Sequence, residues 1–299
     1  MGKERIDLLI IDPQNDFCSP DAAAKQGTPQ EGDGVYEGTL YVPGADEDMK
    51  RLASMIDRYG DKIKKIHITL DCHHKYDIAH PGFWRNSAGE NPEPFTIITH
   101  KDIVDGVWFP IFSHLPVKDP ETNDFYEARK YVKEYAKKLE DSGRYPLCIY
   151  NEHCLISKTG NNVLPVLSEA LTRWEQKNHN NVNFVSKGSN ICTEHYSGIM
   201  AEIPDPNDAS TQLNTRLIQT LMDSDKILIA GEAKSHCLKF SVEDIANNFG
   251  DDSYIKKLCL LEDGASSVIS PFVDFPAIAD QFVADMSARG MQTALTTDF

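Results

Sequence analysis

Three side chains that could act together in nucleophilic chemistry each follow a short apolar run, namely Asp12, Lys187 and Cys237. Such a run is typical of a strand buried in a parallel sheet, and the carboxyl ends of parallel strands meet at one edge. A cysteine with a carboxylate base and a cation beside it is an activated nucleophile. At Cys237 the predicted strand feeds a helix through a tight turn, and a helix N-terminus favours a thiolate. The pattern predicts a nucleophilic site at one sheet edge.

Each of the three residues also has an ordinary structural explanation. An isolated cysteine such as Cys237 is often one more small buried residue. Asp12 precedes Pro13, and an aspartate before a proline often begins a turn. Lys187 either reaches solvent from the end of its strand or, if it is buried, needs a carboxylate partner. Asp12 is the obvious candidate for that partner.

A second group of polar residues follows the apolar residues 66–70. Asp71, His73, His74 and His80 lie within one short stretch. On an extended backbone Asp71 and His73 point to the same side, whereas His74 points to the other. A set of one carboxylate and imidazoles with open positions suits zinc, iron or manganese. The alternative is a polar loop with solvated histidines.

His153 is a candidate for a remote third metal ligand. It follows a short apolar strand that we expect within the segment PLCIY. The alternative is a structural histidine that is hydrogen-bonded within the fold.

Composition limits the class of partner. The 299 residues carry a net charge of −16, and 40% of them are hydrophobic, which is ample for a core. An acidic surface repels nucleic acid and anionic membranes, so we expect a small-molecule partner. Seven cysteines without the spacing of a small disulfide-rich domain fit a reducing compartment. The charged first residues and the lack of a long apolar run predict a soluble, cytoplasmic protein.

The elements that must position these side chains alternate along the chain. Apolar runs of strand length are followed by stripes of helical spacing, for example Met49, Leu52 and Ile56 before Gly60. This alternation predicts an α/β fold of three layers, in which helices cover both faces of a mostly parallel sheet. Residues 18–44 are expected to form a long surface loop.

Residues 81–143 interrupt the alternation. Much of this stretch is rich in proline and contains Trp84 and Trp108, and we expect a helix from about Asn123. We interpret the stretch as an ordered insertion in a single domain that spans residues 1–299. Because it lies between two metal-ligand segments, we expect it to cover the pocket.

Five ordered segments resemble the motifs of the isochorismatase-like cysteine hydrolases, and within them the nicotinamidases and pyrazinamidases. The segments are IDPQNDF, DCHH with HPGFW, YNEHC, KGSNICTEHYSG and GEAKSHC, and together they span almost the entire chain. They resemble the family's D-x-Q-N-D-F segment, metal loop, W-P-x-H-C segment, lysine and S-Y-S stretch, and nucleophile turn. Five motifs in the same order rarely arise by chance, so the resemblance implies the family's fold.

The resemblance implies a catalytic role for three residues. Asp12 would be the proton-transfer base, Lys187 its electrostatic partner and Cys237 the nucleophile. It also implies a cis peptide between Glu232 and Ala233, and an oxyanion hole formed by the N–H groups of Ala233 and Cys237.

The resemblance further implies one divalent metal ion, with zinc first and iron or manganese as alternatives. Its ligands would be Asp71, His73 and His153, with His80 as a direct or water-mediated fourth.

Phe17, Tyr150 and Tyr196 match positions that wall the ring pocket in the family. The sequence departs from the pattern in three places. Tyr150 stands where tryptophan is usual, Asn151 replaces the following proline, and the stretch before His153 is longer than in compact members. These departures concern the shape of the pocket and leave the triad intact.

The function implied is a metal-dependent amidase that converts nicotinamide to nicotinate and ammonia through a Cys237 thioester, a step of NAD salvage. A cysteine nucleophile favours amide over vinyl-ether hydrolysis. One alternative is a related cysteine amidase that acts on another small amide. A second is a non-catalytic metal-binding scaffold whose insertion docks a partner. A homo-oligomer is compatible with each of these functions.

Overall fold

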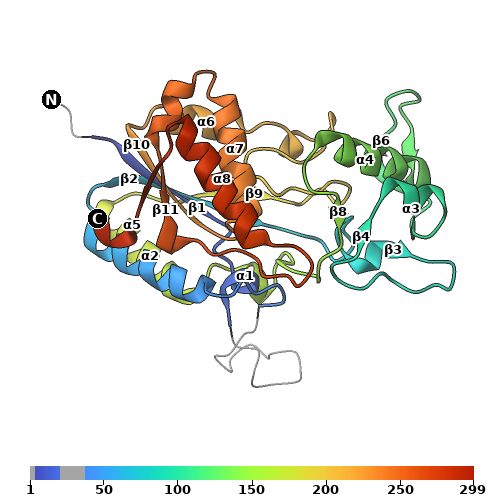
Figure 1. Ribbon diagram of the computed structural model, residues 1–299, viewed down its shortest axis with the longest axis horizontal. Helices are drawn as coiled ribbons and strands as arrows, with labels where there is room; N and C mark the ends of the chain where they lie inside the picture. The colour runs from blue at the N-terminus through green and yellow to red at the C-terminus, as the bar shows by residue number, and fades with distance from the viewer. Residues whose placement is uncertain (1–3, 21–37) are drawn as a thin grey trace.

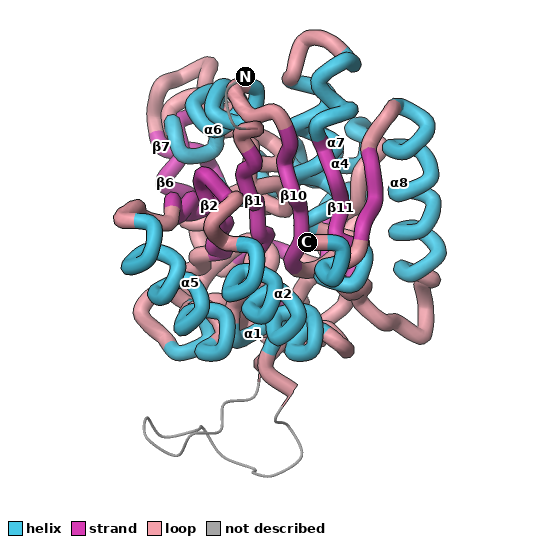
Figure 2. The backbone as a smooth tube through the Cα atoms, turned by 90° about the vertical axis from the view of Figure 1, so that its left-hand side faces the viewer, coloured by secondary structure: helices cyan, strands magenta, loops and turns pink. Residues whose placement is uncertain are grey.

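The computed structural model describes residues 4–20 and 38–299, and a sheet of six parallel strands lies at its centre (Figure 1). The strand order is β12, β11, β10, β1, β2, β9, and Figure 2 shows β2, β1, β10 and β11 side by side. The strands are β1 (Ile6–Ile11), β2 (Ile63–Asp71), β9 (Asn183–Lys187), β10 (Lys226–Gly231), β11 (Leu258–Leu261) and β12 (Gln292–Ala294). β1 therefore lies inside the sheet, between β10 and β2.

Apolar side chains of β1 point alternately into two cores, because successive residues of a strand face opposite sides. Leu8 and Ile10 belong to the core on one face, and Leu9 and Ile11 to the core on the other. Helices α2 and α5 cover the first face and α6, α7 and α8 the second (Figure 1). The helices are α1 (Asn15–Cys18), α2 (Ala45–Tyr59), α5 (Pro165–Asn178), α6 (Thr215–Met222), α7 (Cys237–Asn248) and α8 (Phe275–Arg289). The predicted three-layer fold is confirmed.

The stripe on α2 illustrates how the sequence forms these helices. Met49, Leu52 and Ile56 are buried against the sheet, as the helical spacing predicts. Gly60 ends the helix and donates its N–H to Ile56 O at 2.9 Å. A Cβ at Gly60 would lie 2.5 Å from that oxygen, so the close approach requires glycine.

The insertion forms a lobe at the end of the molecule opposite the C-terminus (Figure 1). Its elements are β3 (Trp84–Arg85), β4 (Ile97–Ile98), α3 (His100–Val104), β5 (Phe109–Pro110), β6 (His114–Lys118), β7 (Phe125–Glu127), α4 (Ala128–Ser142) and β8 (Leu147–Cys148). Phe83, Trp84 and Tyr135 are buried in a core that is separate from the two cores of the sheet. The lobe is therefore ordered around its own apolar side chains.

One expectation about this region is wrong. The helix begins at Ala128 and not at about Asn123, because Phe125–Glu127 pairs as a strand with β6. The short strand expected within PLCIY is confirmed as Leu147–Cys148, and it pairs with β4 outside the central sheet.

The loop expected at residues 18–44 falls partly outside the described residues, which resume at residue 38. Among the helices of the described part of the chain, none has the length and apolar character needed to cross a membrane.

Candidate active site

The register of the sheet brings the chemically interesting residues to one edge. Ile11 at the end of β1 pairs with Gly231 of β10, and Asp71 at the end of β2 pairs with Lys187 of β9. Asp12 follows β1 directly. Because these strands are parallel, their carboxyl ends lie together, where open α/β sheets place their sites.

Lys187 is a buried cation at the centre of this edge, only 2% exposed. Its Nζ lies 3.0 Å from Asp12 Oδ2 and 3.1 Å from Asp71 Oδ1. It donates to His195 O at 2.9 Å and lies 3.7 Å from Cys237 Sγ. The structure thus brings Asp12, Lys187 and Cys237 together, and the same ammonium group contacts a candidate metal ligand.

Asp12 is oriented by the hydroxyl of Thr69 on the neighbouring strand. This hydroxyl accepts the Asp12 N–H at 3.0 Å and donates to Asp12 Oδ1 at 2.6 Å. Beside it, Gly231 has a φ of +110°, and a Cβ there would lie 2.1 Å from Ile11 O. The close approach of β10 to β1 below the site therefore requires glycine.

Burial and neighbouring charges determine the protonation of these groups. Burial raises the pKa of Asp12, an effect that Lys187 opposes and Asp71 increases. For Lys187, burial alone would lower the pKa, but Asp12 and Asp71 raise it well above its usual range. Burial also raises the pKa of the Cys237 thiol well above its ordinary value, although Lys187 opposes this. The resting nucleophile is therefore a thiol that needs a base, and the helix N-terminus alone does not hold it as a thiolate.

Cys237 is presented by the turn between β10 and α7, where it is the first helical residue. The peptide between Glu232 and Ala233 is cis, as the family resemblance implies. Ala233 O accepts the N–H groups of His236 and Leu238, at 2.9 Å and 3.2 Å. The first N–H groups of a helix have no intrahelical acceptor, so this turn can offer donors to a developing oxyanion.

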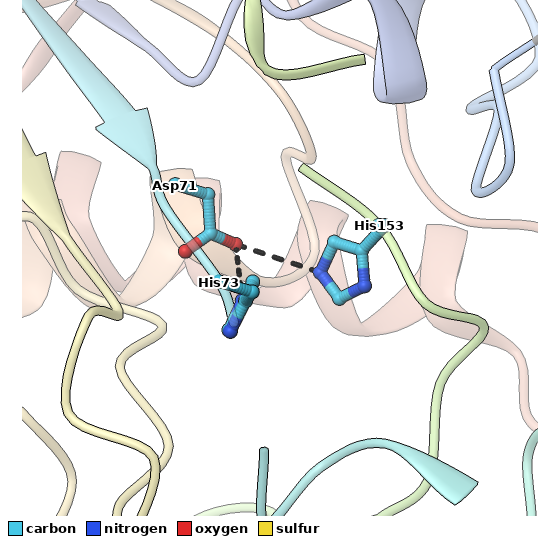
Figure 3. Close-up of side chains that lie close together, drawn as sticks. All are labelled: Asp71, His73 and His153. Carbon is cyan, nitrogen blue, oxygen red and sulfur yellow. Dashed lines mark ion pairs between the residues drawn. The ribbon is translucent and has the colours of Figure 1, made fainter. Parts of the chain in front are cut away.

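Asp71, His73 and His153 form a group that could hold a metal ion, since their ligand atoms all lie within 4.8 Å of one another. Asp71 Oδ2 lies 3.1 Å from His73 Nε2 and 3.6 Å from His153 Nε2 (Figure 3). Asp71 Oδ1 and His73 Nε2 are both buried, the first beside the Lys187 ammonium and the second beside Asp71 Oδ2. A buried carboxylate and two imidazoles that converge in this way fit a divalent cation.

Neighbouring groups fix the orientation of both imidazoles. Asp77 Oδ2 lies 3.1 Å from His73 Nδ1, and His153 Nδ1 donates to Asn151 O at 2.8 Å. Each ring therefore turns its Nε2 toward Asp71, which is the arrangement of a supported metal ligand. Burial favours the neutral form of His73, but Asp71 and Asp77 raise its pKa well above the usual value.

The other two histidines of the metal loop differ in position. His80 is buried, and its Nε2 lies 3.3 Å from His153 Nδ1, on the side of that ring away from Asp71. Burial lowers the pKa of His80 to about 2, so its ring is neutral. His80 is not in the group of three, and its role as a fourth ligand stays a prediction. His74 is exposed, as its strand position predicts.

The segment IDPQNDF forms hydrogen bonds with the backbone of the segments that carry Asp71 and His153. Gln14 Oε1 accepts the Asp71 N–H at 2.7 Å, and Gln14 Nε2 donates to Asp71 O at 2.7 Å. Asp16 Oδ2 accepts the N–H of Cys154, next to His153, at 2.6 Å. The motif thus ties β2 and the His153 segment to the end of β1.

A largely apolar pocket lies beside the thiol. It is lined by Phe17, Leu40, Val42, Asp71, Phe95, Tyr150, His153, Glu194, His195, Tyr196, Ala233, His236, Cys237 and Val268. The four residues that the resemblance places around the substrate, Phe17, Tyr150, Tyr196 and Ala233, are all in this wall. The hydroxyl groups of Tyr150 and Tyr196 are hydrogen-bonded to each other at 2.9 Å.

Seven residues of the wall were not identified from the sequence: Leu40, Val42, Phe95, Glu194, His195, His236 and Val268. Burial raises the pKa of Glu194 to about 7 and lowers that of His195 and of His236 to about 3. Glu194, His195 and His236 lie inside two quoted motifs, so motif membership is the signal that could have identified them. Phe95 comes from the insertion and carries no such signal.

The fold and the site define the class of protein that this chain resembles. Solved nicotinamidases and pyrazinamidases share the three-layer α/β fold of this chain, so the resemblance is confirmed at the level of the fold. No protein-family model and no curated protein matches the sequence.

Three solved structures illustrate the likeness. A yeast nicotinamidase bound to the inhibitor nicotinaldehyde has a TM-score of 0.59 and 16% identity, over 97% of this chain and 99% of its own. An Acinetobacter baumanii nicotinamidase/pyrazinamidase has a TM-score of 0.55 and 15% identity, over 100% and 99%. A Pyrococcus horikoshii pyrazinamidase in complex with zinc has a TM-score of 0.50 and 15% identity, over 97% and 99%.

Proposed function

We propose that this protein is a cysteine amidase that hydrolyses nicotinamide to nicotinate and ammonia. The observation that carries the proposal is that Asp12 and Lys187 meet Cys237, which lines an aromatic pocket, and that three side chains that could hold a metal ion lie beside them. The three structural neighbours named as nicotinamidases or pyrazinamidases support the same chemistry. The chain would be a single hydrolase domain over residues 1–299 with an insertion at about 81–143. It would act in NAD salvage in the cytoplasm.

Acylation begins with proton transfer from the Cys237 thiol to Asp12. The thiol has a raised pKa, and Asp12 lies within hydrogen-bonding reach of it. As the sulfur bonds to the amide carbon, the carbonyl electrons move to oxygen, where the N–H groups of Ala233 and Cys237 stabilise the charge. Such donors typically contribute about 3 to 4 kcal/mol. Asp12 then protonates the amide nitrogen, the C–N bond breaks, and ammonia leaves a Cys237 thioester.

Deacylation uses the same base a second time. Asp12 takes a proton from a water molecule as the water oxygen attacks the thioester carbon. The C–S bond breaks, the carboxylic acid is released, and Asp12 returns the proton to the Cys237 sulfur. Lys187 remains charged throughout, because its contacts with Asp12 and Asp71 raise its pKa, and it offsets the charge that moves between sulfur and carboxylate.

Asp71, His73 and His153 would hold the metal ion, with zinc as the first candidate and iron or manganese as alternatives. A bound divalent ion supplies a Lewis acid that can anchor a ring nitrogen or a water molecule. The chain itself keeps the two imidazoles aimed at the site through Asp77 and Asn151. The zinc complex of the Pyrococcus pyrazinamidase supports this assignment.

A related amidase that acts on another small amide is the second candidate. The hydrogen-bonded hydroxyl groups of Tyr150 and Tyr196 favour it, because they add polar groups to the pocket wall. At the position of Tyr150 the resembled family has tryptophan. A ligand with an additional acceptor on its ring would use these hydroxyl groups.

Ammonia release from a panel of amides, with metal analysis of the same purified protein, tests the proposal. Nicotinamide and pyrazinamide should be hydrolysed, and benzamide should be disfavoured by roughly 10²- to 10³-fold in kcat/KM, since it lacks the ring nitrogen. Equal turnover of benzamide would move the assignment to the second candidate. An absence of ammonia with every amide, in protein that carries a full equivalent of metal, would refute an amidase.

A further inference from the structure

Glu232 is a buried acidic residue in the turn that presents the nucleophile, and the chemistry above does not use it. It follows the apolar strand β10 and is fully buried. Its N–H donates to Ile11 O at 2.8 Å, and its carbonyl belongs to the cis peptide with Ala233. A change in the position of Glu232 would therefore move Ala233, whose N–H faces the reacting carbonyl in the proposed function.

The side chain of Glu232 contacts a second buried carboxyl group. This group is Asp48 on α2, and Asp48 forms an ion pair with Arg51. Glu232 Oε2 accepts the N–H of Ser266 at 3.1 Å, while the Ser266 hydroxyl donates to Asp48 Oδ2 at 2.6 Å. Glu232 Oε1 is buried and accepts no hydrogen bond from the described residues. Two carboxyl groups in contact away from water can be hydrogen-bonded only if they share a proton.

The charges around the pair place that proton on Glu232. Burial and the charge of Asp48 raise the pKa of Glu232 well above its ordinary value, and Arg51 opposes this effect only in part. Cys18 also faces the pair, and burial together with Glu232 and Asp48 raises the pKa of its thiol, so Cys18 adds no charge. The negative charge of Asp46 also raises the pKa of the Cys18 thiol. Of the two carboxyl groups, Glu232 is thus the one that holds the shared proton.

The same contacts link the turn to the loop that forms the opposite pocket wall. Lys234 N donates to Ser266 O at 2.7 Å, and Val268 N donates to Ser235 Oγ at 3.2 Å. The Ser235 hydroxyl in turn lies 2.8 Å from His236 Nδ1. Val268 and His236 both line the pocket. The carboxyl pair therefore lies at the base of two segments that together shape the site.

We propose that Glu232 is a positioning residue of the amidase: in its neutral form it donates a hydrogen bond to Asp48 and thereby fixes the turn that carries the Ala233 N–H and Cys237. This inference rests on the proposed function. Glu232 acts through the backbone of Ala233 and does not touch the substrate. Ionisation of Glu232 would place two carboxylates in contact and displace the turn, so turnover falls at alkaline pH.

Three variants separate this role from simple structural support. Glu232→Gln keeps a donor for Asp48 and an acceptor for Ser266 but cannot ionise. It should retain kcat within about threefold and move the alkaline limb of the kcat profile to higher pH. Glu232→Leu loses both contacts, and kcat should fall roughly 10- to 100-fold with KM nearly unchanged. Glu262→Gln, on an exposed residue after β11, is the matched control and should behave as wild type.

The outcomes are distinguishable from a failure of the proposed function. If the wild type hydrolyses nicotinamide but Glu232→Leu keeps full kcat, or Glu232→Gln leaves the alkaline limb in place, the positioning role is wrong and the function stands. If the wild type releases no ammonia, both the amidase function and the positioning role of Glu232 are refuted. If Glu232→Leu does not fold, the Glu232→Gln profile decides. Infrared spectra at neutral pH give a reading independent of activity: the difference between the wild type and Glu232→Gln should contain one carboxylic acid band, and the absence of that band would overturn the shared proton.

Discussion

Lys187 has a role that no neighbouring side chain can take over, because it contacts both buried carboxylates of the site. Asp12 and Asp71 lie 3.0 Å and 3.1 Å from its ammonium group. Removing one partner of a buried ion pair typically costs about 3 to 5 kcal/mol, since it leaves the other charge uncompensated. Variants of Lys187 therefore mix catalytic and structural effects, and Cys237 and Asp12 give cleaner tests.

Cys237→Ala should abolish turnover and leave the fold intact. The sulfur is the proposed attacking atom, and a cysteine-to-alanine change costs only about 1 to 3 kcal/mol of stability. A loss of at least about 10³-fold in kcat is expected, measured by ammonia release, with thermal unfolding as the control for folding. Activity within tenfold of wild type would exclude Cys237 as the nucleophile.

Asp12→Asn should be nearly as severe as Cys237→Ala, because an amide cannot take the thiol proton. The two losses should also be strongly non-additive. Because the two residues act as one unit, removal of either one already removes their joint contribution to the rate. The double variant is therefore expected to be no slower than the worse single variant. Losses that multiply would show that Asp12 and Cys237 act independently.

His153→Ala should have the effect of chelation, although this residue is distant from Asp71 in the sequence. It removes one of three convergent ligands, so metal content after dialysis should fall well below one equivalent and activity should fall with it. His74→Ala is the matched control, because His74 is an exposed histidine on the same loop. A full equivalent of metal with normal kinetics in His153→Ala would refute the ligand set.

At the scale of elements, the insertion contributes one aromatic residue to the pocket. Phe95 is 51% exposed, and its ring meets the edge of Tyr150 at a centroid distance of 6.2 Å. Phe95→Ala should raise KM for nicotinamide about 3- to 10-fold and leave kcat nearly unchanged, since an aromatic contact of this kind contributes about 0.5 to 1.5 kcal/mol. Phe125→Ala is the control, because Phe125 is an exposed aromatic residue of the same lobe. An unchanged KM in Phe95→Ala would show that the lobe does not shape substrate binding.

The inner strands β1 and β10 of the central sheet could be predicted from the sequence because they contain apolar runs, whereas the edge strands β9 and β12 are mostly exposed. The proximity of Asp12, Lys187 and Cys237 could be predicted as well, because each of them follows a predicted strand. The lobe could not, since its strands have few residues and find their partners far along the chain. Ile97–Ile98, for example, pairs with Leu147–Cys148. The carboxyl pair of Glu232 and Asp48 also has no local signal, because it exists only where α2 packs beneath the turn.

At the scale of the whole molecule, Glu232 should make stability depend on pH. Its ordinary pKa is 4.5, and its pKa in the folded protein is well above that. As the pH rises, the unfolded chain therefore releases this proton at a lower pH than the folded chain does. The contribution of Glu232 to stability is complete below pH 4.5 and declines as the pH rises toward the folded pKa.

Denaturant unfolding of the wild type and Glu232→Gln at several pH values measures this contribution. Above pH 4.5 the wild type should lose stability relative to the variant, by up to about 1.4 kcal/mol per pH unit. Parallel stability curves for the two proteins would contradict a protonated Glu232.

The separate core of the lobe has a consequence for how the molecule loses its structure on warming. Phe83, Trp84 and Tyr135 belong to an apolar cluster distinct from the two clusters that flank the sheet. Regions with their own core can open as cooperative units of their own, with a free energy below that of global unfolding. We expect amides of α4 to exchange with solvent before those of β1 and β10. Ile78 belongs to this core and directly follows Asp77, which orients His73. Local melting of the lobe would thus release the metal-ligand loop and the mouth of the pocket while the strand that ends at Asp12 is still folded.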